Sequence, residues 1–347
     1  MPMLTFQEAL DKLNSYKRHL LLGNGFGIAC KPDIFIYKKL FEQADFSALS
    51  PSAKEAFGRL ETNDFERVIK SLHDAAKVLS AYKENNELVA KLNKDAEDIK
   101  ELLVKTIAKS HPNCPTDITN EEYTTCQKFL NNFDSIYTLN YDLLLYWTIM
   151  HNPKGQKPIW EDGFSTSYSD VINQHQSDYV VWKSSNTHNK NKKIWFLHGA
   201  LHIFDSATEI QKYTWNRTNI RLIEQTRDAL DKNLFPLFVA EGTSQEKLEK
   251  IRHSDYLNKA YRSFESLGHC LFIYGHSLAE NDEHYLQLIE RGKIKHIFVG
   301  FRGDIHSDRN KSKLERVKLM AMRRKEYSKH LSRQNLKRQT EKGFDKK

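Results

Sequence analysis

The sequence predicts an α/β protein with a mostly parallel, doubly wound sheet, and two observations lead to this class. Short apolar runs, each stopped by glycine or by polar residues, recur between residues 18 and 299, as expected of buried strands. Segments with apolar residues at spacings of three and four lie between several of these runs and indicate helices. Strands that alternate with helices favour a parallel sheet covered on both faces.

The first expected elements are a helix over 7–16 and a strand over 18–22 that a glycine stops. Residues 33–132 then carry a mainly helical pattern, which predicts a large insertion between the first strand and the second. The second strand is expected over 134–140. Further strands, with a helical pattern over 248–264 among them, are expected over 179–182, 194–197, 201–204, 234–239, 271–274 and 296–299.

The composition indicates a folded, soluble protein, since 39% of the 347 residues are hydrophobic and 28% are charged. No segment approaches the roughly 18 apolar residues that cross a membrane, and residues 1–10 lack the basic and apolar regions of a secretion signal. The four cysteines form no C-x-x-C pair, and the histidines and carboxylates show no recognisable metal-ligand spacing. We therefore expect a cytoplasmic protein with reduced thiols and no bound metal.

The net charge of +8 is concentrated at the C-terminus. Residues 305–347 hold 15 lysines and arginines against 5 acidic residues, which leaves 38 basic and 40 acidic side chains in residues 1–304. We therefore divide the chain into a core domain, 1–304, and a basic helical tail, 305–347. A uniformly basic nucleic-acid-binding fold is disfavoured. Contact of the tail with nucleic acid or a partner protein is a weaker alternative than a solvated helix.

The first motif is the turn Gly23-Asn24-Gly25-Phe26 after the first strand. Glycine permits positive φ and close backbone approach, so the amides of such a turn and of the helix after it can hold a pyrophosphate. The full G-x-G-x-x-G fingerprint is absent. A tight turn without a ligand explains this motif equally well.

Two later strands end in side chains suited to chemistry. The second strand leads into Asn140 and Asp142, where an amide can orient a hydroxyl or a water and a carboxylate can hold a carboxamide. An Asx turn that closes the strand is the alternative. The strand over 194–197 leads to His198 beside Gly199, and a histidine exchanges protons near neutral pH. A core or capping histidine is the alternative there.

The fourth motif follows the strand over 271–274. Gly275 and Ser277 are small enough for an adenosine ribose to lie against the strand end, and Asn281 or Asp282 is expected to cap the next helix. His276 is either a second acid or base or a structural, ligand-lining residue, and we favour the second interpretation.

In this order, GNG, TLNYD, LHG and GHSLAEND resemble the motifs of the sirtuin-like superfamily. They look most like its bacterial branch, long filed as a domain of unknown function, which also carries the intervening Asp162-Gly163-Phe164. The resemblance covers about residues 15–304, and the ordered combination is what makes it specific. It implies a Rossmann-like sheet with a helical insertion that binds NAD between the two, and a relation to antiviral enzymes that deplete NAD.

The resemblance also implies roles for individual residues. Asn140 would position the nicotinamide ribose and a water, and His198 would be the general base. Asp142 would meet the carboxamide. Deacylating sirtuins carry a four-cysteine zinc module that this sequence lacks, so protein deacylation is disfavoured. The residues that would contact NAD are Gly23, Asn24, Gly25, Phe26, Thr138, Asp142, Gly275, Ser277 and Asn281.

The resulting hypothesis is an NAD glycohydrolase that releases nicotinamide and ADP-ribose, with NAD as its substrate, in antiphage defence. The bond to be cut joins a good leaving group to a carbon that becomes oxocarbenium-like, much as in glycoside hydrolysis. The alternative is a non-catalytic module that senses NAD or ADP-ribose and docks a partner or nucleic acid through residues 305–347. By analogy with relatives, we expect control by homo-oligomerisation or by a partner such as a hexameric ATPase.

Overall fold

The computed structural model describes most of the chain. The described residues are 3–13, 15–30, 41–82, 86–110, 115–151, 159–173, 177–183, 192–206, 208–214, 220–231, 236–239 and 243–344.

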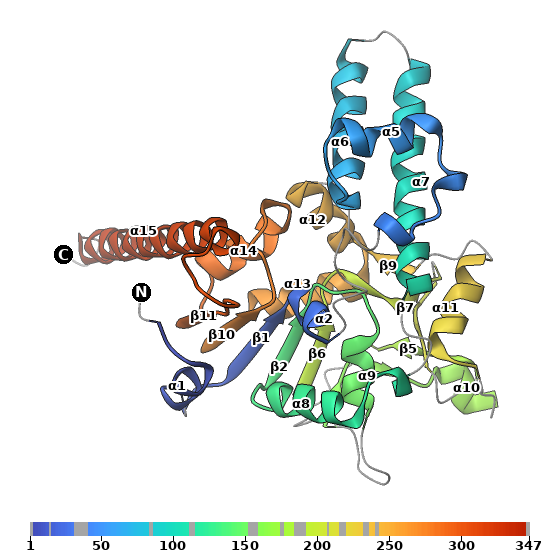
Figure 1. Cartoon of the computed structure of the whole chain (residues 1–347). Helices are drawn as coiled ribbons and strands as arrows, with labels where there is room; N and C mark the ends of the chain where they lie inside the picture. The colour runs from blue at the N-terminus through green and yellow to red at the C-terminus, as the bar shows by residue number, and fades with distance from the viewer. Residues whose placement is uncertain are drawn as a thin grey trace.

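A six-stranded parallel sheet forms the centre of the molecule (Figure 1). Its strand order is β11-β10-β1-β2-β6-β3, and every neighbouring pair is parallel. The predicted α/β, Rossmann-like fold class is confirmed. The strands of this sheet are β1 (Arg18–Leu22), β2 (Ser135–Thr138), β3 (Trp160–Glu161), β6 (Lys192–Phe196), β10 (Cys270–Tyr274) and β11 (His296–Val299).

The strand order brings the ends of the four predicted motif strands to one edge of this sheet. Leu22 pairs with Tyr274 on one side and with Thr138 on the other, and Thr138 pairs in turn with Phe196. β2 and β6, which follow β1 in the chain, lie on one side of β1, whereas the later strands β10 and β11 lie on its other side. The order therefore reverses between β1 and β10, and ligands of open α/β sheets bind in the crevice outside such a switch point.

Three of the predicted strands belong to a second sheet that the sequence did not distinguish from the first. This sheet has the order β4-β5-β8-β7-β9 and is antiparallel at every pairing. The connection from β7 to β8 is a short turn in which the Ser206 amide donates to the Glu209 carbonyl, and a connection this short permits only antiparallel pairing. The strands are β4 (Phe164–Ser165), β5 (Tyr179–Trp182), β7 (Gly199–Asp205), β8 (Ile210–Tyr213) and β9 (Pro236–Phe238).

The predicted insertion contains the helices that rise above the sheet in Figure 1. Side chains cap several of them: Ser50 and Asp64 accept backbone amides at the starts of α5 and α6, and Thr119 forms a capping box with Glu122 at the start of α8. The predicted residues 33–40, 83–85 and 111–114 lie outside the described part of the chain. The elements are η1 (Phe46–Ala48), α5 (Pro51–Arg59), α6 (Phe65–Ala81), α7 (Asn86–Ser110), η2 (Pro115–Asp117) and α8 (Asn120–Leu130).

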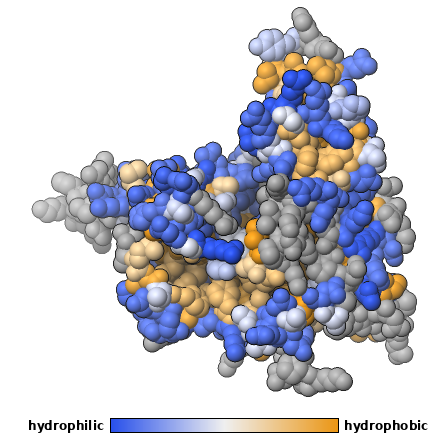
Figure 2. Space-filling view, in the orientation of Figure 1, coloured by the Kyte–Doolittle hydropathy of each residue, from blue (hydrophilic) through white to orange (hydrophobic). Residues whose placement is uncertain are grey.

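Helices cover both faces of the parallel sheet. Phe272 contacts Phe133 and Phe6, with ring centroids 5.3 and 6.1 Å apart. Ile136 lies in the same row of the sheet as Phe272, so its neighbour Tyr137 points to the opposite face, where it contacts Phe264 at 5.1 Å. Apolar residues gather in a hollow on the face of β1 and β10 that Figure 2 presents, and hydrophilic residues surround it.

The helices outside the insertion are mostly short, with a longer one at the C-terminal end. No helix among the described residues combines the length and the apolar character that crossing a membrane requires. These elements are α1 (Phe6–Asp11), α2 (Gly25–Cys30), α9 (Leu144–Met150), α10 (Tyr168–Asn173), α11 (Leu222–Asp231), α12 (Ser244–His253), α13 (Asp255–Glu265), η3 (Glu280–Asp282), α14 (Glu283–Arg291) and α15 (Asp308–Phe344).

The basic tail forms the long helix α15, and its first half packs on the core. Met320 is buried, and the Arg323 guanidinium lies 3.0 Å from Glu283 and 3.3 Å from Glu290 in α14. Arg316 donates to the Leu278 carbonyl oxygen at 2.8 Å. The predicted division at residue 304 stays a prediction, but α15 makes contacts with the loop that follows β10.

Phe264→Ala is expected to destabilise the fold by about 3–5 kcal/mol, because the ring is 1% exposed and its loss leaves a cavity between α13, β2 and α14. Urea unfolding followed by circular dichroism measures this change. Phe6→Ala is the matched control, since Phe6 is 42% exposed and should cost much less. Equal costs for the two variants would contradict the packing described.

Candidate functional site

The turn after β1 and the loop after β10 touch through glycines. A Cβ on Gly25 would lie 2.5 Å from the Gly275 Cα, and a Cβ on Gly23 would lie 2.7 Å from the His276 Cα. Gly275 has a φ of +70°, which side chains rarely adopt. The Gly23 amide donates to the Tyr274 carbonyl at 3.0 Å, and the Gly25 amide donates to the Gly275 carbonyl at 2.8 Å. These glycines therefore serve a backbone contact between two loops.

This contact changes the interpretation of the glycine turn. The Phe26 amide donates to the Gly23 carbonyl at 3.0 Å, and the Phe26 ring is buried. The amides of Gly23, Gly25 and Phe26 thus all donate to protein oxygens in this structure. A role for the turn in holding a pyrophosphate stays a prediction.

The loop after β2 combines a local turn with a buried carboxyl group. The Thr138 hydroxyl accepts the Asn140 amide at 3.0 Å, and Asp142 Oδ1 accepts the Leu144 amide at 2.8 Å at the start of α9. Asp142 therefore forms the Asx turn that the sequence offered as an alternative. Burial raises the pKa of Asp142 to about 6. Asn140 is also buried, at 8% exposure.

His198 lies two residues after the last residue of β6, and backbone contacts hold it in place. Its carbonyl accepts the Val239 amide at 3.0 Å. Gly199 has a φ of +80°, and a Cβ there would lie 1.9 Å from the Leu237 carbonyl oxygen, so only glycine fits after the histidine. The His198 side chain is buried, and no hydrogen-bond partner satisfies its Nε2 atom among the described residues. Burial holds the pKa of His198 well below its ordinary value, although the Asp282 charge opposes this effect. The imidazole is therefore neutral.

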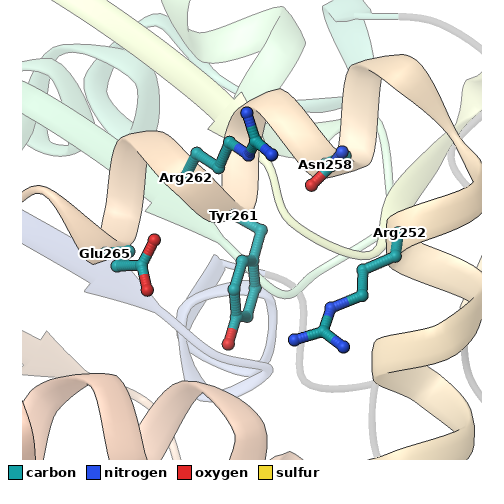
Figure 3. Close-up of a pocket in the computed structure, with 5 residues that line it drawn as sticks. All are labelled: Arg252, Asn258, Tyr261, Arg262 and Glu265. Carbon is teal, nitrogen blue, oxygen red and sulfur yellow. The ribbon is translucent and has the colours of Figure 1, made fainter.

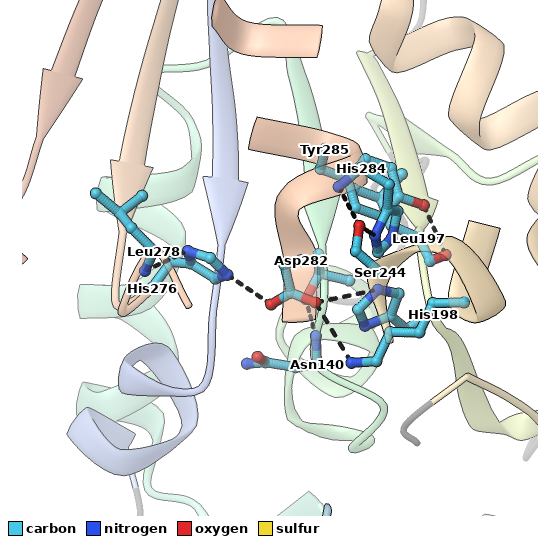
Figure 4. A network of polar contacts seen from close by, with 11 residues as sticks. Asn140, Leu197, His198, Ser244, His276, Leu278, Asp282, His284 and Tyr285 are labelled. Atoms are coloured by element: carbon cyan, nitrogen blue, oxygen red, sulfur yellow. Dashed lines mark hydrogen bonds and ion pairs between the residues drawn. The ribbon is translucent and has the colours of Figure 1, made fainter. Parts of the chain in front are cut away.

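Asp282 is the centre of the polar network in Figure 4. His276 Nδ1 accepts the Leu278 amide at 2.9 Å, so the His276 proton is on Nε2, which donates to Asp282 Oδ2 at 2.9 Å. The other oxygen, Oδ1, lies 3.4 Å from the Lys247 ammonium and 3.7 Å from His198 Nε2. Burial alone would raise the pKa of Asp282, but the His276 hydrogen bond and the Lys247 charge hold it far below its ordinary value.

His284 brings a third buried imidazole to Asp282. Ser244 Oγ accepts the His284 amide at 2.7 Å and lies 3.0 Å from His284 Nδ1. The Ser244 hydroxyl has one proton and two lone pairs, so it can donate to Nδ1 or accept from it. His284 Nε2 has no hydrogen-bond partner among the described residues. Burial lowers the pKa of His284 to about 4.

His198, Asp282 and His284 also offer the ligand types of a metal centre. Their ligand atoms lie within 4.8 Å of one another. However, the Lys247 ammonium already contacts Asp282 Oδ1 at 3.4 Å, and a divalent cation at the same oxygen would be repelled by it. The donor set fits a carboxylate neutralised by lysine better than a metal site.

A surface hollow lies on the helices beside this network (Figure 3). Arg252 and Tyr261 extend into it from α12 and α13. The Tyr261 ring packs against Tyr285 at 5.5 Å, and the Tyr285 hydroxyl donates to the Leu197 carbonyl at 3.0 Å. None of the predicted site residues is among its lining residues, which are Arg252, Asn258, Tyr261, Arg262 and Glu265.

The structure thus brings His198, His276 and Asp282 into one network and leaves Ser277 exposed at the loop. Asn281 is half-buried in η3, and Asp282 stands at the N-cap of α14 without a side-chain capping bond. Sequence reasoning missed Lys247 and His284. Both lie in helices, where a single lysine or histidine gives no signal that it points inward.

The comparisons with known proteins identify the family. A family model described as "Domain of unknown function (DUF4917)" matches residues 20–333, and the chain belongs to this family. The matched segment includes every predicted site residue and continues into α15. No curated protein matches the chain.

Gly275→Ala is expected to destabilise the protein by about 2–4 kcal/mol, because the new methyl group meets the backbone of Gly25 and Phe26 at a positive φ. Thermal and urea unfolding measure the change. The control is Gly58→Ala in α5, where a Cβ would meet nothing within 4 Å. This substitution should stabilise the helix by roughly 0.5–1 kcal/mol. A neutral Gly275→Ala would contradict the loop contact described.

The buried histidines predict a loss of stability in mild acid. The folded pKa of His284 is about 4 against an unfolded value of about 6.5, so the unfolded state binds more protons between these values. Stability therefore falls as pH drops from about 6.5 towards 4, by roughly 2 kcal/mol at pH 5 from this group. His19 and His198 act in the same direction.

Urea unfolding at pH 7.5 and 5 isolates the contribution of His284 when wild type is compared with His284→Gln. The variant should lose about 2 kcal/mol less stability than wild type over this range. His253→Gln, on the exposed end of α12, is the matched control. An unchanged pH dependence in His284→Gln would show that His284 is not buried in the neutral form.

Proposed function

We propose that the protein hydrolyses the nicotinamide–ribose bond of NAD and releases nicotinamide and ADP-ribose. The observation that carries this proposal is the neutral, buried imidazole of His198 beside Asp282, at the sheet edge where Asn140 also lies. A general base in this protonation state, close to the switch point of a parallel sheet, suits hydrolysis of a bound dinucleotide.

The motif resemblance supports NAD as the substrate. The four strand ends GNG, TLNYD, LHG and GHSLAEND resemble those of the sirtuin-like superfamily in their order, and all four come from strands of the parallel sheet that pair in register. NAD-depleting antiviral enzymes are the relatives that this resemblance favours. The resemblance alone does not distinguish cleavage of NAD from binding, and the protonation state of His198 favours cleavage.

In the proposed reaction Asn140 holds the nicotinamide ribose and the attacking water. As the bond to nicotinamide breaks, the ribose carbon becomes oxocarbenium-like and water adds to it. His198 removes a proton from that water or from a ribose hydroxyl. The products are nicotinamide, ADP-ribose and one proton, and no metal is required to activate the leaving group.

Asp282 and Lys247 adjust His198 for this role. When the imidazole accepts a proton, the Asp282 carboxylate 3.7 Å away stabilises the imidazolium. Burial keeps the resting imidazole neutral by lowering its pKa, and the Lys247 ammonium on the same oxygen acts in the same direction. Asn140 and His198 are both buried in the free protein, so the proposal requires the site to open for the dinucleotide.

The biological role that we propose is cytoplasmic NAD depletion during antiphage defence, with activity held in check by homo-oligomerisation or by a hexameric ATPase partner. A second candidate is a non-catalytic sensor of NAD or ADP-ribose that uses its basic tail to contact a partner or nucleic acid. The hydrogen bond from Arg316 in α15 to Leu278 in the loop after β10 favours the sensor. A ligand that moves this loop would also move the start of the tail.

His198→Ala and Asn140→Ala distinguish the two candidates. If His198 is the general base, His198→Ala loses about 100-fold to 10,000-fold in turnover while it still binds NAD. Asn140→Ala should also lose turnover, because the ribose is no longer held in a reactive geometry. Release of nicotinamide and ADP-ribose is measured by liquid chromatography with mass spectrometry, and binding by calorimetry.

The matched control is His253→Ala, an exposed histidine on α12, which should retain full turnover. The assay is run on the purified chain alone and with candidate partners. Binding without turnover in the wild type under every condition would favour the sensor. Full activity in His198→Ala would remove this residue as the base.

A further inference from the structure

Two cysteines far apart in the sequence meet beside the candidate site. Cys30 ends α2 and Cys126 lies in α8, and their Sγ atoms are 3.4 Å apart although the residues are 96 positions apart. Both side chains are partly exposed. A disulfide bond is about 2.05 Å long, so the two sulfur atoms need to approach by little more than 1 Å. Small rotations of the two side chains can produce a shift of this size.

The pair stands where the helical insertion leaves the sheet and returns to it. α2 follows the turn after β1, and α8 precedes β2, so Cys30 and Cys126 enclose the described insertion helices α5, α6 and α7. α8 is held firmly on its other side. Its Gln127 donates to the Thr148 carbonyl at 2.9 Å and to the His151 carbonyl, and its Tyr123 ring stacks on His151 at 3.9 Å.

We propose that Cys30 and Cys126 are a reversible disulfide site, and that oxidation by a low-molecular-weight disulfide ties the two connections of the helical insertion together. The bond joins the helix after Gly23-Asn24-Gly25 to the helix before the loop of Asn140 and Asp142. It therefore fixes the separation of two loops of the candidate site. The disulfide chemistry itself does not depend on the proposed hydrolysis of NAD.

The environments of the two thiols assign their roles in the reaction. The hydrogen bond between the two thiols lowers the pKa of Cys126, whereas the same hydrogen bond and burial raise the pKa of Cys30. Cys126 is therefore the thiolate that reacts first. The nearby carboxylate of Asp142 also disfavours a thiolate at Cys30, which links this pair electrostatically to the loop after β2.

The reaction proceeds in two balanced exchange steps with oxidised glutathione. The Cys126 thiolate attacks one sulfur of glutathione disulfide, forms a mixed disulfide and releases one glutathione thiolate. Cys30 then loses its proton to solvent and attacks Cys126 Sγ, which releases the second glutathione. Two protein thiols are oxidised, one glutathione disulfide is reduced to two thiols, and dithiothreitol reverses both steps.

Cys270 provides an internal comparison. Its thiol donates to the Lys17 carbonyl at 3.0 Å, and burial raises its pKa to about 11. It has no thiol partner among the described cysteines and should stay reduced. Cys114 lies outside the described residues, so the experiment includes a Cys114→Ser background.

The test incubates the full chain with glutathione disulfide, blocks free thiols with iodoacetamide and identifies peptides by mass spectrometry without reduction. We expect one linked pair, Cys30 with Cys126, in wild type and in Cys114→Ser. Cys270→Ser should retain it, whereas Cys30→Ser should leave a glutathione adduct on Cys126. The oxidised wild type should unfold roughly 5 °C higher than the reduced protein, since the bond closes a long loop.

Two results would overturn the proposal. One is alkylation of both Cys30 and Cys126 after oxidation, which would show that neither thiol reacts. The other is a persistent glutathione adduct, or a link to Cys114 or Cys270, in the wild type. Each result is read from the peptides alone, so it is independent of whether the protein cleaves NAD.

Discussion

The carboxylate of Asp282 is the charge on which the candidate site depends. It is buried, and a buried carboxylate is tolerated only when other groups compensate it. Those groups come from separate parts of the chain: Lys247 from α12, His276 from the loop after β10, and His198 from the end of β6. Their contacts join α12, the loop after β10 and the end of β6 to the start of α14. The same charge opposes the effect of burial on the pKa of His198.

The backbone contact between the turn after β1 and the loop after β10 is the second constraint. Gly23, Gly25 and Gly275 permit an approach that any side chain would prevent. A glycine pattern in a sequence indicates that something lies close to the backbone, but a phosphate and a neighbouring loop make the same demand. Here the neighbouring loop occupies that space. Its position keeps His276 where it can donate to Asp282.

The sequence predicted most of the strands but missed β3, β4 and β8, and it was a poor guide to strand pairing. Apolar runs located β1, β2, β6 and β10 because burial on both faces leaves a local pattern, and an apolar run also located the edge strand β11, which is only partly buried. Strands of the antiparallel sheet carry a similar apolar pattern, so only their pairing in the structure distinguishes them from strands of the parallel sheet. His198 was predictable because it lies just after an apolar run that forms a strand. Lys247, His284 and the contact of Cys30 with Cys126 were not, since each depends on packing between residues distant in the chain.

The C-terminal helix shows why net charge is a weak guide to partners. The net positive charge of the chain comes from residues 305–347, yet Arg316 and Arg323 bind acceptors within the protein. Arg316 holds the carbonyl of Leu278, a buried residue whose φ of +61° is costly outside glycine. The contact helps to stabilise the strained loop between His276 and Asp282. Arginines in the first half of α15 therefore support the loop between His276 and Asp282, whereas other basic residues of that half, such as Lys318 and Lys325, are exposed.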